Sequence, residues 1–185
     1  MTQTGPEALK GEDWAGEMGE RWLASLDRFE SMIAPIGTAL LERAGYQPGE
    51  RVLDLGCGAG AAALCLGARV PGLHLAGLEV QPAYAALARR NAAANGQTMQ
   101  VETGDLAHMP KALRRDFDHV IANPPYYAPG GSPSPIPARD RALRVATPIA
   151  AWVAAAATRL HPGGWLTMIF ATPCLPEALS ALPPQ

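Results

Sequence analysis

The chain has 185 residues, of which 48% are hydrophobic and 17% are charged, and it carries a formal net charge of -2. This length suits one domain with a sizeable core, and the composition is that of an ordinary globular protein. The charge balance excludes a broad basic field, so a nucleic-acid partner would need a local basic patch. The three cysteines form no C-x-x-C pair and the four histidines lack ligand spacing, so we expect no disulfide framework and no metal.

The sequence shows neither the pattern of a membrane-spanning segment nor that of a secretory signal. No apolar run reaches the length of a membrane span, and the N-terminal residues do not place a basic stretch before an apolar one. We therefore predict a cytoplasmic protein that has no membrane partner.

Apolar residues recur every three or four positions from Trp14 to Ile36, which is typical of an amphipathic helix. Pro35 is expected to break or kink this helix, and a second helix is expected from Ile36 to Gly45. We predict that residues 1–50 form an N-terminal helical extension or cap and that residues 51–185 form the main domain.

From residue 51 the predicted strands and helices alternate, which favours an α/β domain with a parallel sheet. A further helix is expected to be opened by Thr147 and Pro148 and closed by Gly163 and Gly164, and the last strand and a last helical turn are expected to follow it. The connection from Tyr126 to Thr147 is longer than an ordinary strand-to-helix link, so we expect it to face the substrate. The expected strands cover residues 51–55, 73–78, 99–103, 117–122 and 165–171, and the expected helices between them cover residues 61–70 and 82–95.

The stretch VLDLGCGAG forms the first predicted strand and the turn that follows it. Asp54 ends the strand, and Gly56, Gly58 and Gly60 lie in a turn where the backbone can approach a ligand closely. Cys57 is expected to fill space in this loop rather than to act as a nucleophile. Asp54 can accept a hydrogen bond from an ammonium group or from the loop amides.

Two further carboxylates follow the next predicted strands. Glu79 is placed to accept both ribose hydroxyls of an adenosine, and Asp105 can receive the adenine amine. A dinucleotide site would need G-x-G-x-x-G, whereas this loop reads G-x-G-x-G after an aspartate that would repel phosphate. S-adenosylmethionine, which has an amino-acid tail and no phosphate, fits better. The alternative is an ordinary glycine-rich turn with surface acids.

The fourth strand ends in NPPYY, residues 123–127. The two prolines stiffen the exit from the sheet and fix the direction of the Pro124 carbonyl. If Asn123 and that carbonyl accept the two hydrogens of an adenine amine, the nitrogen lone pair is aimed at the methyl group, while Tyr126 offers a face for stacking the base. The alternative is a rigid strand exit that only packs two tyrosines.

These motifs, in this order and spacing, resemble class I S-adenosylmethionine-dependent methyltransferases. From about Gly60 to Pro176 the sequence is more similar to the tRNA adenine-N6 methyltransferases. The resemblance implies a Rossmann-like, doubly wound, mostly parallel sheet with strand order 3-2-1-4-5, and catalytic roles for Asn123, Pro124 and Tyr126. The expected cofactor-binding residues are Asp54, Gly56, Cys57, Gly58, Gly60, Glu79, Val80, Asp105, Leu106 and Asn123.

The sequence departs from that group in two places. Residues 13–58 resemble instead the small-molecule methyltransferases related to quinone C-methylating enzymes, so we predict a composite or chimeric chain joined near the glycine loop. The terminal strands of the usual seven-stranded fold are not evident after residue 171. The sheet edge at the expected strand 165–171 would then be open, which predicts a homodimer through that edge.

We predict methylation of an adenine amine in tRNA or another nucleic acid. Arg114 and Arg115, with Arg139, Arg141 and Arg144, could supply a phosphate-binding patch near the long loop, although a solvated face is the more common role for such clusters. A small-molecule methyltransferase is one alternative. The other is a non-catalytic or engineered domain that keeps the fold without the activity.

Overall fold

The computed structural model describes residues 17–125 and 147–183. The chain divides into two units, Met1–Gly45 and Tyr46–Gln185. The first contains α1 (Glu17–Ala44), a single helix with Pro35 inside it. The expectation of two separate helices is therefore wrong. A proline removes one backbone hydrogen bond, and here the turns on both sides continue the helix. Among the helices of the described ranges, none is both long enough and apolar enough to cross a bilayer.

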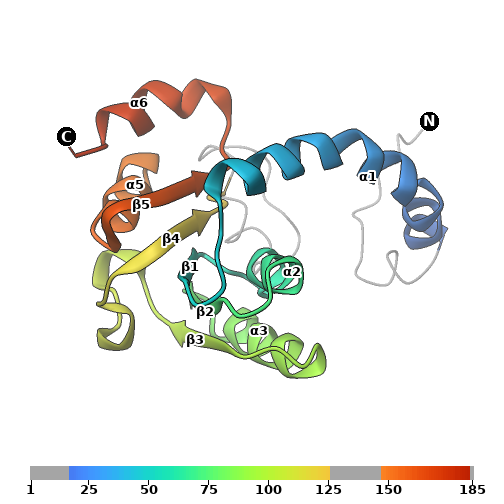
Figure 1. The fold of residues 1–185 in the computed structure, drawn as a ribbon, viewed down its shortest axis with the longest axis horizontal. Coiled ribbons are helices and arrows are strands. Elements are labelled where there is room, and N and C mark those ends of the chain that lie inside the picture. The colour runs from blue at the N-terminus through green and yellow to red at the C-terminus, as the bar shows by residue number, and fades with distance from the viewer. Residues whose placement is uncertain (1–16, 126–146, 184–185) are drawn as a thin grey trace, which may run out of the picture. The chain divides into compact units, whose positions relative to one another are not determined.

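The second unit is built on a five-stranded sheet with the order β3-β2-β1-β4-β5, as predicted (Figure 1). Each pair of neighbouring strands is parallel. The strands are β1 (Arg51–Leu55), β2 (His74–Glu79), β3 (Met99–Thr103), β4 (Phe117–Ala122) and β5 (Leu160–Met168). In a parallel sheet all carboxyl ends lie along one edge, which is where ligands bind in folds of this kind.

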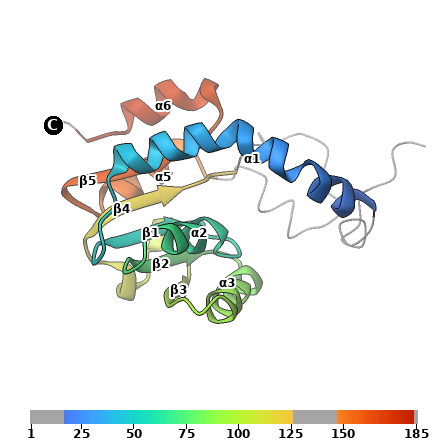
Figure 2. The ribbon, with the colours of Figure 1, turned by 45° about the vertical axis from the view of Figure 1, so that its right-hand side comes forward.

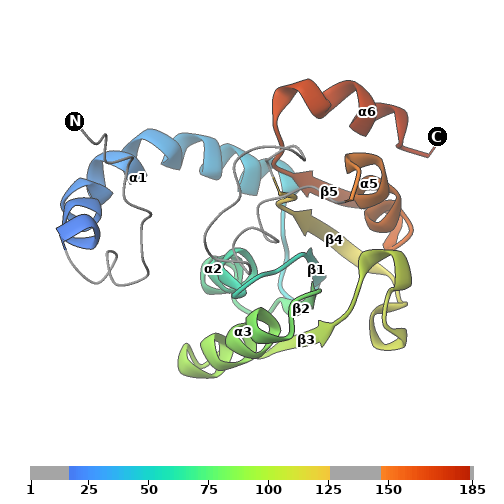
Figure 3. The same cartoon turned by 180° about the vertical axis from the view of Figure 1, so that it is seen from behind.

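Helices connect the strands as the alternating pattern predicted. Figures 2 and 3 show α2 and α3 beside β1, β2 and β3, and Figure 3 shows α5 beside β4 and β5. The described helices of this unit are α2 (Ala61–Arg69), α3 (Pro82–Ala94), α5 (Ile149–Ala157) and α6 (Leu175–Ser180), with short 3-10 turns η2 (Leu106–His108), η3 (Lys111–Leu113) and η4 (Thr172–Cys174).

The two faces of β1 have different neighbours because side chains alternate along a strand. Leu53 and Leu55 belong to the main hydrophobic cluster, together with Trp152 and Val153 of α5. Asp54 points to the opposite face and receives a backbone hydrogen bond from Ala63 at the start of α2. Four of the five β1 residues are buried, so this strand is the centre of the core and also the support of the site at its end.

The structure differs from the sequence prediction at β5. Gly163 and Gly164 do not end the preceding helix, which stops at Ala157; they lie inside β5. The register between β4 and β5 shifts there, because Phe117 pairs with Leu160 whereas His119 pairs with Trp165. A Cβ on Gly164 would lie 2.9 Å from the Asp118 carbonyl oxygen, so the glycine permits the close backbone approach at this irregularity.

Candidate active site

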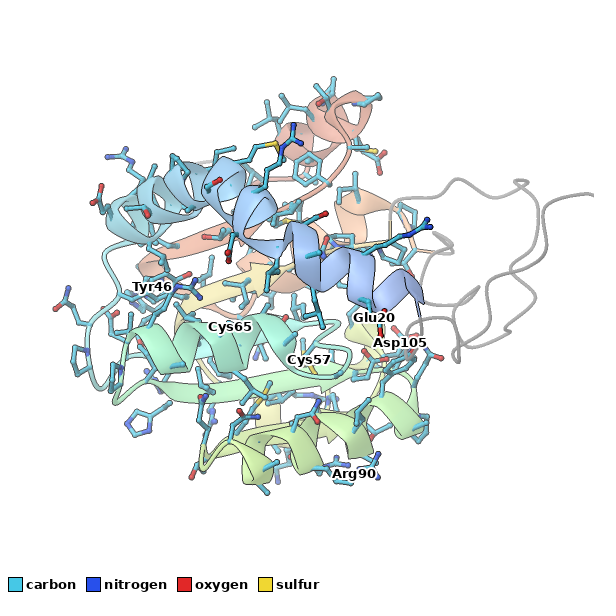
Figure 4. The ribbon with its side chains drawn as sticks, turned by 90° about the vertical axis from the view of Figure 1, so that its right-hand side faces the viewer. Glu20, Tyr46, Cys57, Cys65, Arg90 and Asp105 are labelled. Atoms are coloured by element: carbon cyan, nitrogen blue, oxygen red, sulfur yellow. The ribbon has the colours of Figure 1, made fainter. Side chains whose placement is uncertain are left out.

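The register of the sheet brings the predicted site residues to one edge. Leu55 pairs with Leu78 on one side and with Ala122 on the other, so the residues that follow these three strands leave the sheet next to one another. Glu79 pairs in turn with Thr103, two residues before Asp105. Figure 4 labels Cys57 in the loop after β1 and Asp105 beyond the end of β3. The acids and Asn123, far apart in the sequence, thus share one rim.

The glycine loop after β1 is held by backbone hydrogen bonds to β2. The N–H groups of Gly56 and Cys57 both donate to the Leu78 carbonyl, at 2.8 and 3.0 Å. Gly56 has φ +69° and Gly58 has φ +53°, a region that side chains disfavour. No atom of the described residues lies within 4 Å of the place where a Cβ of Gly58 would be, so these residues leave the backbone accessible to a ligand there.

Glu79 supports the loop from the neighbouring strand. Its side chain is 5% exposed, and its two carboxylate oxygens accept hydrogen bonds from the Gly58 N–H at 2.9 Å and from the Gln81 N–H at 2.7 Å. A buried carboxylate is stable only when its oxygens are paired in this way. Each oxygen keeps a second lone pair, so Glu79 can fix the loop and still accept a ligand hydroxyl.

Asp54 is the buried acid of the site. Its side chain is 4% exposed, and Oδ2 has no hydrogen-bond partner among the described residues. Burial raises the pKa of Asp54 to about 7, the hydrogen bond from Ala63 opposes this shift, and the charge of Glu79 adds to it. A carboxylate in this position is stabilised by a cation, and the ammonium group of an amino acid is one of suitable size.

Cys57 has the environment of a packing residue. It is 7% exposed, and burial, with the charges of Asp54 and Glu79, raises the pKa of its thiol to about 12. The thiolate that nucleophilic chemistry needs is therefore suppressed near neutral pH. The two other cysteines are also free thiols: Cys65 is exposed on α2 and Cys174 is half-buried.

Asp105 follows β3 and is exposed, and its Oδ1 accepts a hydrogen bond from the Ala107 N–H at 2.8 Å. This bond caps η2 and leaves the other carboxylate oxygen for a ligand. Leu106 packs against the main cluster, whereas Val80 is 58% exposed at the same rim. Both positions can offer apolar contact to a flat ring.

Asn123 and Pro124 follow β4 directly. Asn123 is exposed and Pro124 is buried, so the polar side chain is accessible while the backbone behind it is packed. Ala122 pairs with Leu55, which places Asn123 next to the start of the glycine loop. Tyr126 and the expected substrate-facing segment that follows it lie outside the described residues. Arg114 and Arg115 precede β4, so its full length separates them from Asn123.

Sequence reasoning missed two residues that support the loop. The Asn91 side chain, on α3, donates to the Ala59 carbonyl at 2.9 Å. Trp152, on α5, packs against Gly56. The available signals were an asparagine in the middle of a helix and a single large residue in the alanine-rich stretch IAAWVAAAA. Within the described ranges, no group of three His, Cys, Asp or Glu residues is arranged to hold a metal ion.

The residues at this rim fit S-adenosylmethionine. The unpaired Asp54 oxygen suits an ammonium group, the Glu79 and Asp105 carboxylates each retain acceptor capacity, and the space beside Gly58 admits a ligand. Comparison with known proteins decides the family, because the Methyltransferase small domain family matches residues 34–177. The chain belongs to this family. Its cofactor is S-adenosylmethionine, and the family consists of methyltransferases that depend on it.

The individual relatives that the chain resembles are named for different acceptors. The chain is 34% identical over 129 residues to a release factor glutamine methyltransferase of Deinococcus radiodurans, covering 64% of this chain and 44% of the relative. It is 32% identical over 114 residues to a tRNA1(Val) (adenine(37)-N6)-methyltransferase of Actinobacillus succinogenes, covering 60% and 48% respectively. The chain therefore spans less than half the length of either relative.

Among solved structures, the crystal structure of TrmN from Thermus thermophilus matches with a TM-score of 0.60 and 27% identity, covering 80% of this chain and 40% of that one. The family match runs from residue 34 to residue 177, across the glycine loop where a junction was predicted. The composite origin of the chain stays a prediction.

Proposed function

We propose that this methyltransferase transfers the methyl group to a planar amino nitrogen, and that the acceptor is the exocyclic amine of an adenine in tRNA. The observation that carries this proposal is the position of Asn123 and Pro124, directly after β4 and next to the glycine loop. The similarity to the adenine-N6 methyltransferase of Actinobacillus succinogenes supports the choice of adenine.

The chemistry requires control of a poor nucleophile. The lone pair of an adenine amine is delocalised into the ring. When the Asn123 side-chain oxygen and the Pro124 carbonyl accept hydrogen bonds from the two N–H groups of this amine, the nitrogen is drawn towards a tetrahedral shape. The cofactor supplies an electrophilic methyl group on a sulfonium. After transfer of the methyl group to the nitrogen, the cofactor would leave as S-adenosylhomocysteine and the nitrogen would release a proton to water. The residues act by positioning and by excluding solvent, so no histidine base is needed.

On the cofactor side, we propose that Asp54 pairs with the ammonium group of the amino-acid tail, Glu79 accepts the ribose hydroxyls and Asp105 accepts the adenine amine of the cofactor. Gly56, Cys57, Gly58 and Gly60 form the loop against which the tail lies. Val80 and Leu106 contact the adenine ring, and Tyr126 stacks on the acceptor base. The support is the shared rim and the unpaired oxygen of Asp54.

A glutamine side chain in a protein is a second candidate acceptor. The similarity to the release factor glutamine methyltransferase of Deinococcus radiodurans favours it. A carboxamide nitrogen is planar and has two N–H bonds, as an adenine amine does, so the same pair of acceptors would hold it. The two candidates differ in whether phosphate contacts are needed for acceptor binding.

The experiment offers unmodified tRNA and an unmodified release factor to the protein, with S-adenosylmethionine labelled in its methyl group. Mass spectrometry of the digested products identifies the methylated nucleoside or amino acid. N6-methyladenosine, formed in an amount that falls steeply as salt rises, supports the first proposal, whereas methylated glutamine supports the second. Labelling of small acceptors alone would favour a small-molecule methyltransferase. Cofactor binding without transfer to any acceptor would indicate a non-catalytic domain.

We also propose that the protein forms a homodimer through β5. This strand is an edge of the sheet, and Trp165, Ile169, Leu175 and Leu179 near it are at least 40% exposed. An edge strand with apolar neighbours tends to pair with another chain. Light scattering after gel filtration measures the mass directly. A dimer that a charged substitution, Ile169→Lys, converts to monomer supports the proposal, and a monomeric parent protein contradicts it.

A further inference from the structure

Trp152 lies against the glycine loop. A Cβ on Gly56 would lie 2.7 Å from Cη2 and 3.1 Å from Cζ3 of the Trp152 ring, so the indole occupies the space where a side chain would be. Gly56 has φ +69°, and its N–H donates to the Leu78 carbonyl at 2.8 Å. The Gly56 backbone is therefore held by a hydrogen bond to β2 and by contact with the far edge of the indole.

The same indole belongs to the part of the core beneath the rest of the rim. Trp152 is 8% exposed and is a member of the cluster that contains Leu55 and Ala122, the last residues of β1 and β4. Leu106, directly after Asp105, packs against this cluster. The Trp152 side chain thus belongs to the hydrophobic cluster that supports the glycine loop, the turn after β3 and the end of β4 next to Asn123.

The polar atom of Trp152 points to a role beyond filling space. Its Nε1 is buried and has no hydrogen-bond partner among the described residues. Burying an N–H without an acceptor destabilises the folded protein, and an apolar side chain would avoid that cost. Only the long bicyclic ring, however, reaches Gly56 from α5; the Cη2 and Cζ3 atoms that make the contact belong to the part of the indole that a phenylalanine lacks.

We propose that Trp152 is a positioning residue of the cofactor site, which acts through Gly56 to hold the glycine loop in the conformation that binds S-adenosylmethionine. Trp152 also shares its hydrophobic cluster with Ala122, the residue before Asn123, so the same side chain packs beneath the acceptor side of the site. This inference rests on cofactor binding and not on the identity of the acceptor. It is therefore tested with S-adenosylhomocysteine alone.

The first test compares Trp152→Phe with the matched control Trp165→Phe on β5. Calorimetric titration should show that Trp152→Phe weakens S-adenosylhomocysteine binding about tenfold, because loss of the contact lets the loop shift. Circular dichroism should show that Trp152→Phe remains folded at the temperature of the titration, although loss of buried ring atoms lowers its melting temperature more than in the control, and the control should bind as the parent does. Unchanged binding by a folded Trp152→Phe protein would overturn the proposal.

The second test asks whether the effect passes through Gly56. Gly56→Ala should weaken binding strongly, since the added methyl meets the indole and since the backbone at φ +69° disfavours any side chain; only the first of these two effects depends on Trp152. In the double variant with Trp152→Phe the atoms that the methyl would meet are gone. The two losses of affinity should then be less than multiplicative, because residues in contact couple. Losses that multiply would show that Trp152 acts independently of the loop and would overturn the proposal.

A third measurement keeps the inference testable if Trp152→Phe does not fold. The variant in which Trp14, Trp22 and Trp165 are replaced by phenylalanine retains Trp152 as its sole tryptophan. Its emission should shift when S-adenosylhomocysteine is added, with a midpoint equal to the calorimetric Kd. Emission that stays constant while calorimetry reports binding would show that the environment of the indole does not change with the loop. That result would contradict the proposal.

Discussion

Glu79 holds the backbone of Gly58 through a hydrogen bond of 2.9 Å across the space between β2 and the glycine loop. The same carboxylate binds the Gln81 N–H at the start of α3, so one buried side chain fixes two turns of the rim. A residue that could be regarded only as a ligand contact therefore also preserves the shape of the site in the absence of ligand.

Glu79→Ala is expected to weaken S-adenosylhomocysteine binding by roughly 100-fold, because it removes the ligand acceptor and leaves two backbone N–H groups without a partner. The cost in stability should be about 1–3 kcal/mol for the same reason. Titration calorimetry and urea denaturation measure the two effects. Glu79→Gln keeps one acceptor and should lose less of both. Equal affinity in the parent and Glu79→Ala would exclude Glu79 from the cofactor site.

Asp54 predicts a pH dependence of stability. Its pKa of about 7 in the folded chain lies above the ordinary 3.8, so the folded state binds the proton more tightly than the unfolded state does. Above about pH 7 the carboxylate is ionised while buried, and its destabilising effect on the folded state is greatest. The free energy of unfolding therefore rises as pH falls from 7 towards 4. Urea denaturation between pH 8 and pH 5.5 should show this rise in the parent and a smaller one in Asp54→Asn.

Cofactor affinity should have the opposite pH dependence. An ammonium group binds the ionised form of Asp54, so the Kd of S-adenosylhomocysteine should rise by up to about tenfold for each pH unit below 7. In Asp54→Asn the affinity should be low and nearly independent of pH over the same range. Calorimetry in buffers matched for ionic strength gives both profiles. Parallel profiles in the two proteins would assign the pH dependence to another group.

A buried polar cluster lies at the amino ends of β1 and β4, at the opposite end of these strands from the candidate site. His119 is 2% exposed, its Nε2 lies 2.9 Å from Glu50 Oε2, and the Tyr46 ring lies 4.0 Å from its own ring, centroid to centroid. Glu50 also accepts a hydrogen bond from the Gln47 N–H at 2.7 Å. Burial raises the pKa of Tyr46, in keeping with a closed cluster.

Glu50→Ala is therefore expected to destabilise the protein by about 1–3 kcal/mol, because the buried imidazole loses its observed partner. Glu50→Gln, which keeps an acceptor, should cost less. Both variants should bind S-adenosylhomocysteine as the parent does, since β1 and β4 separate the cluster from the rim. A large loss of affinity in Glu50→Gln would show that the two edges of the sheet are coupled.

The sequence was sufficient for the parts of the fold that local patterns encode. The period of the apolar residues predicted the helices and strands, and their alternation predicted parallel strands, whereas the strand order came from the resemblance to a known family. It also placed Asp54, Glu79, Asp105 and Asn123 at strand ends, because register makes those ends neighbours. It was wrong at Pro35, where the flanking turns outweigh one lost hydrogen bond, and at Gly163, which lies in a strand irregularity rather than a helix end. Such choices depend on tertiary pairing.

Contacts between distant segments could not be read in advance for the same reason. Nothing local to Trp152 indicates that its ring reaches Gly56, and nothing local to Asn91 indicates that its amide binds the Ala59 carbonyl. The pairing of Glu79 with the Gly58 N–H likewise depends on how the chain leaves the sheet after β1 and after β2. The roles of the predicted site residues stay predictions, and the interactions that hold these residues became visible only in the folded chain.

A substitution at Asn123 is expected to separate methyl transfer from cofactor binding. Asn123→Ala removes the side-chain oxygen proposed to accept an N–H of the acceptor, but it leaves Pro124 and the glycine loop in place. Transfer to tRNA or to a release factor should fall by at least about 100-fold, because the nitrogen is no longer oriented towards the methyl group. The Kd of S-adenosylhomocysteine should change by less than about threefold, and stability by less than about 0.5 kcal/mol, since the side chain is exposed. Asn123→Asp is the matched variant: it retains an oxygen, so partial activity is expected. Labelled transfer and calorimetry on the same preparations measure the two quantities, and turnover retained by Asn123→Ala would disprove the role assigned to this side chain.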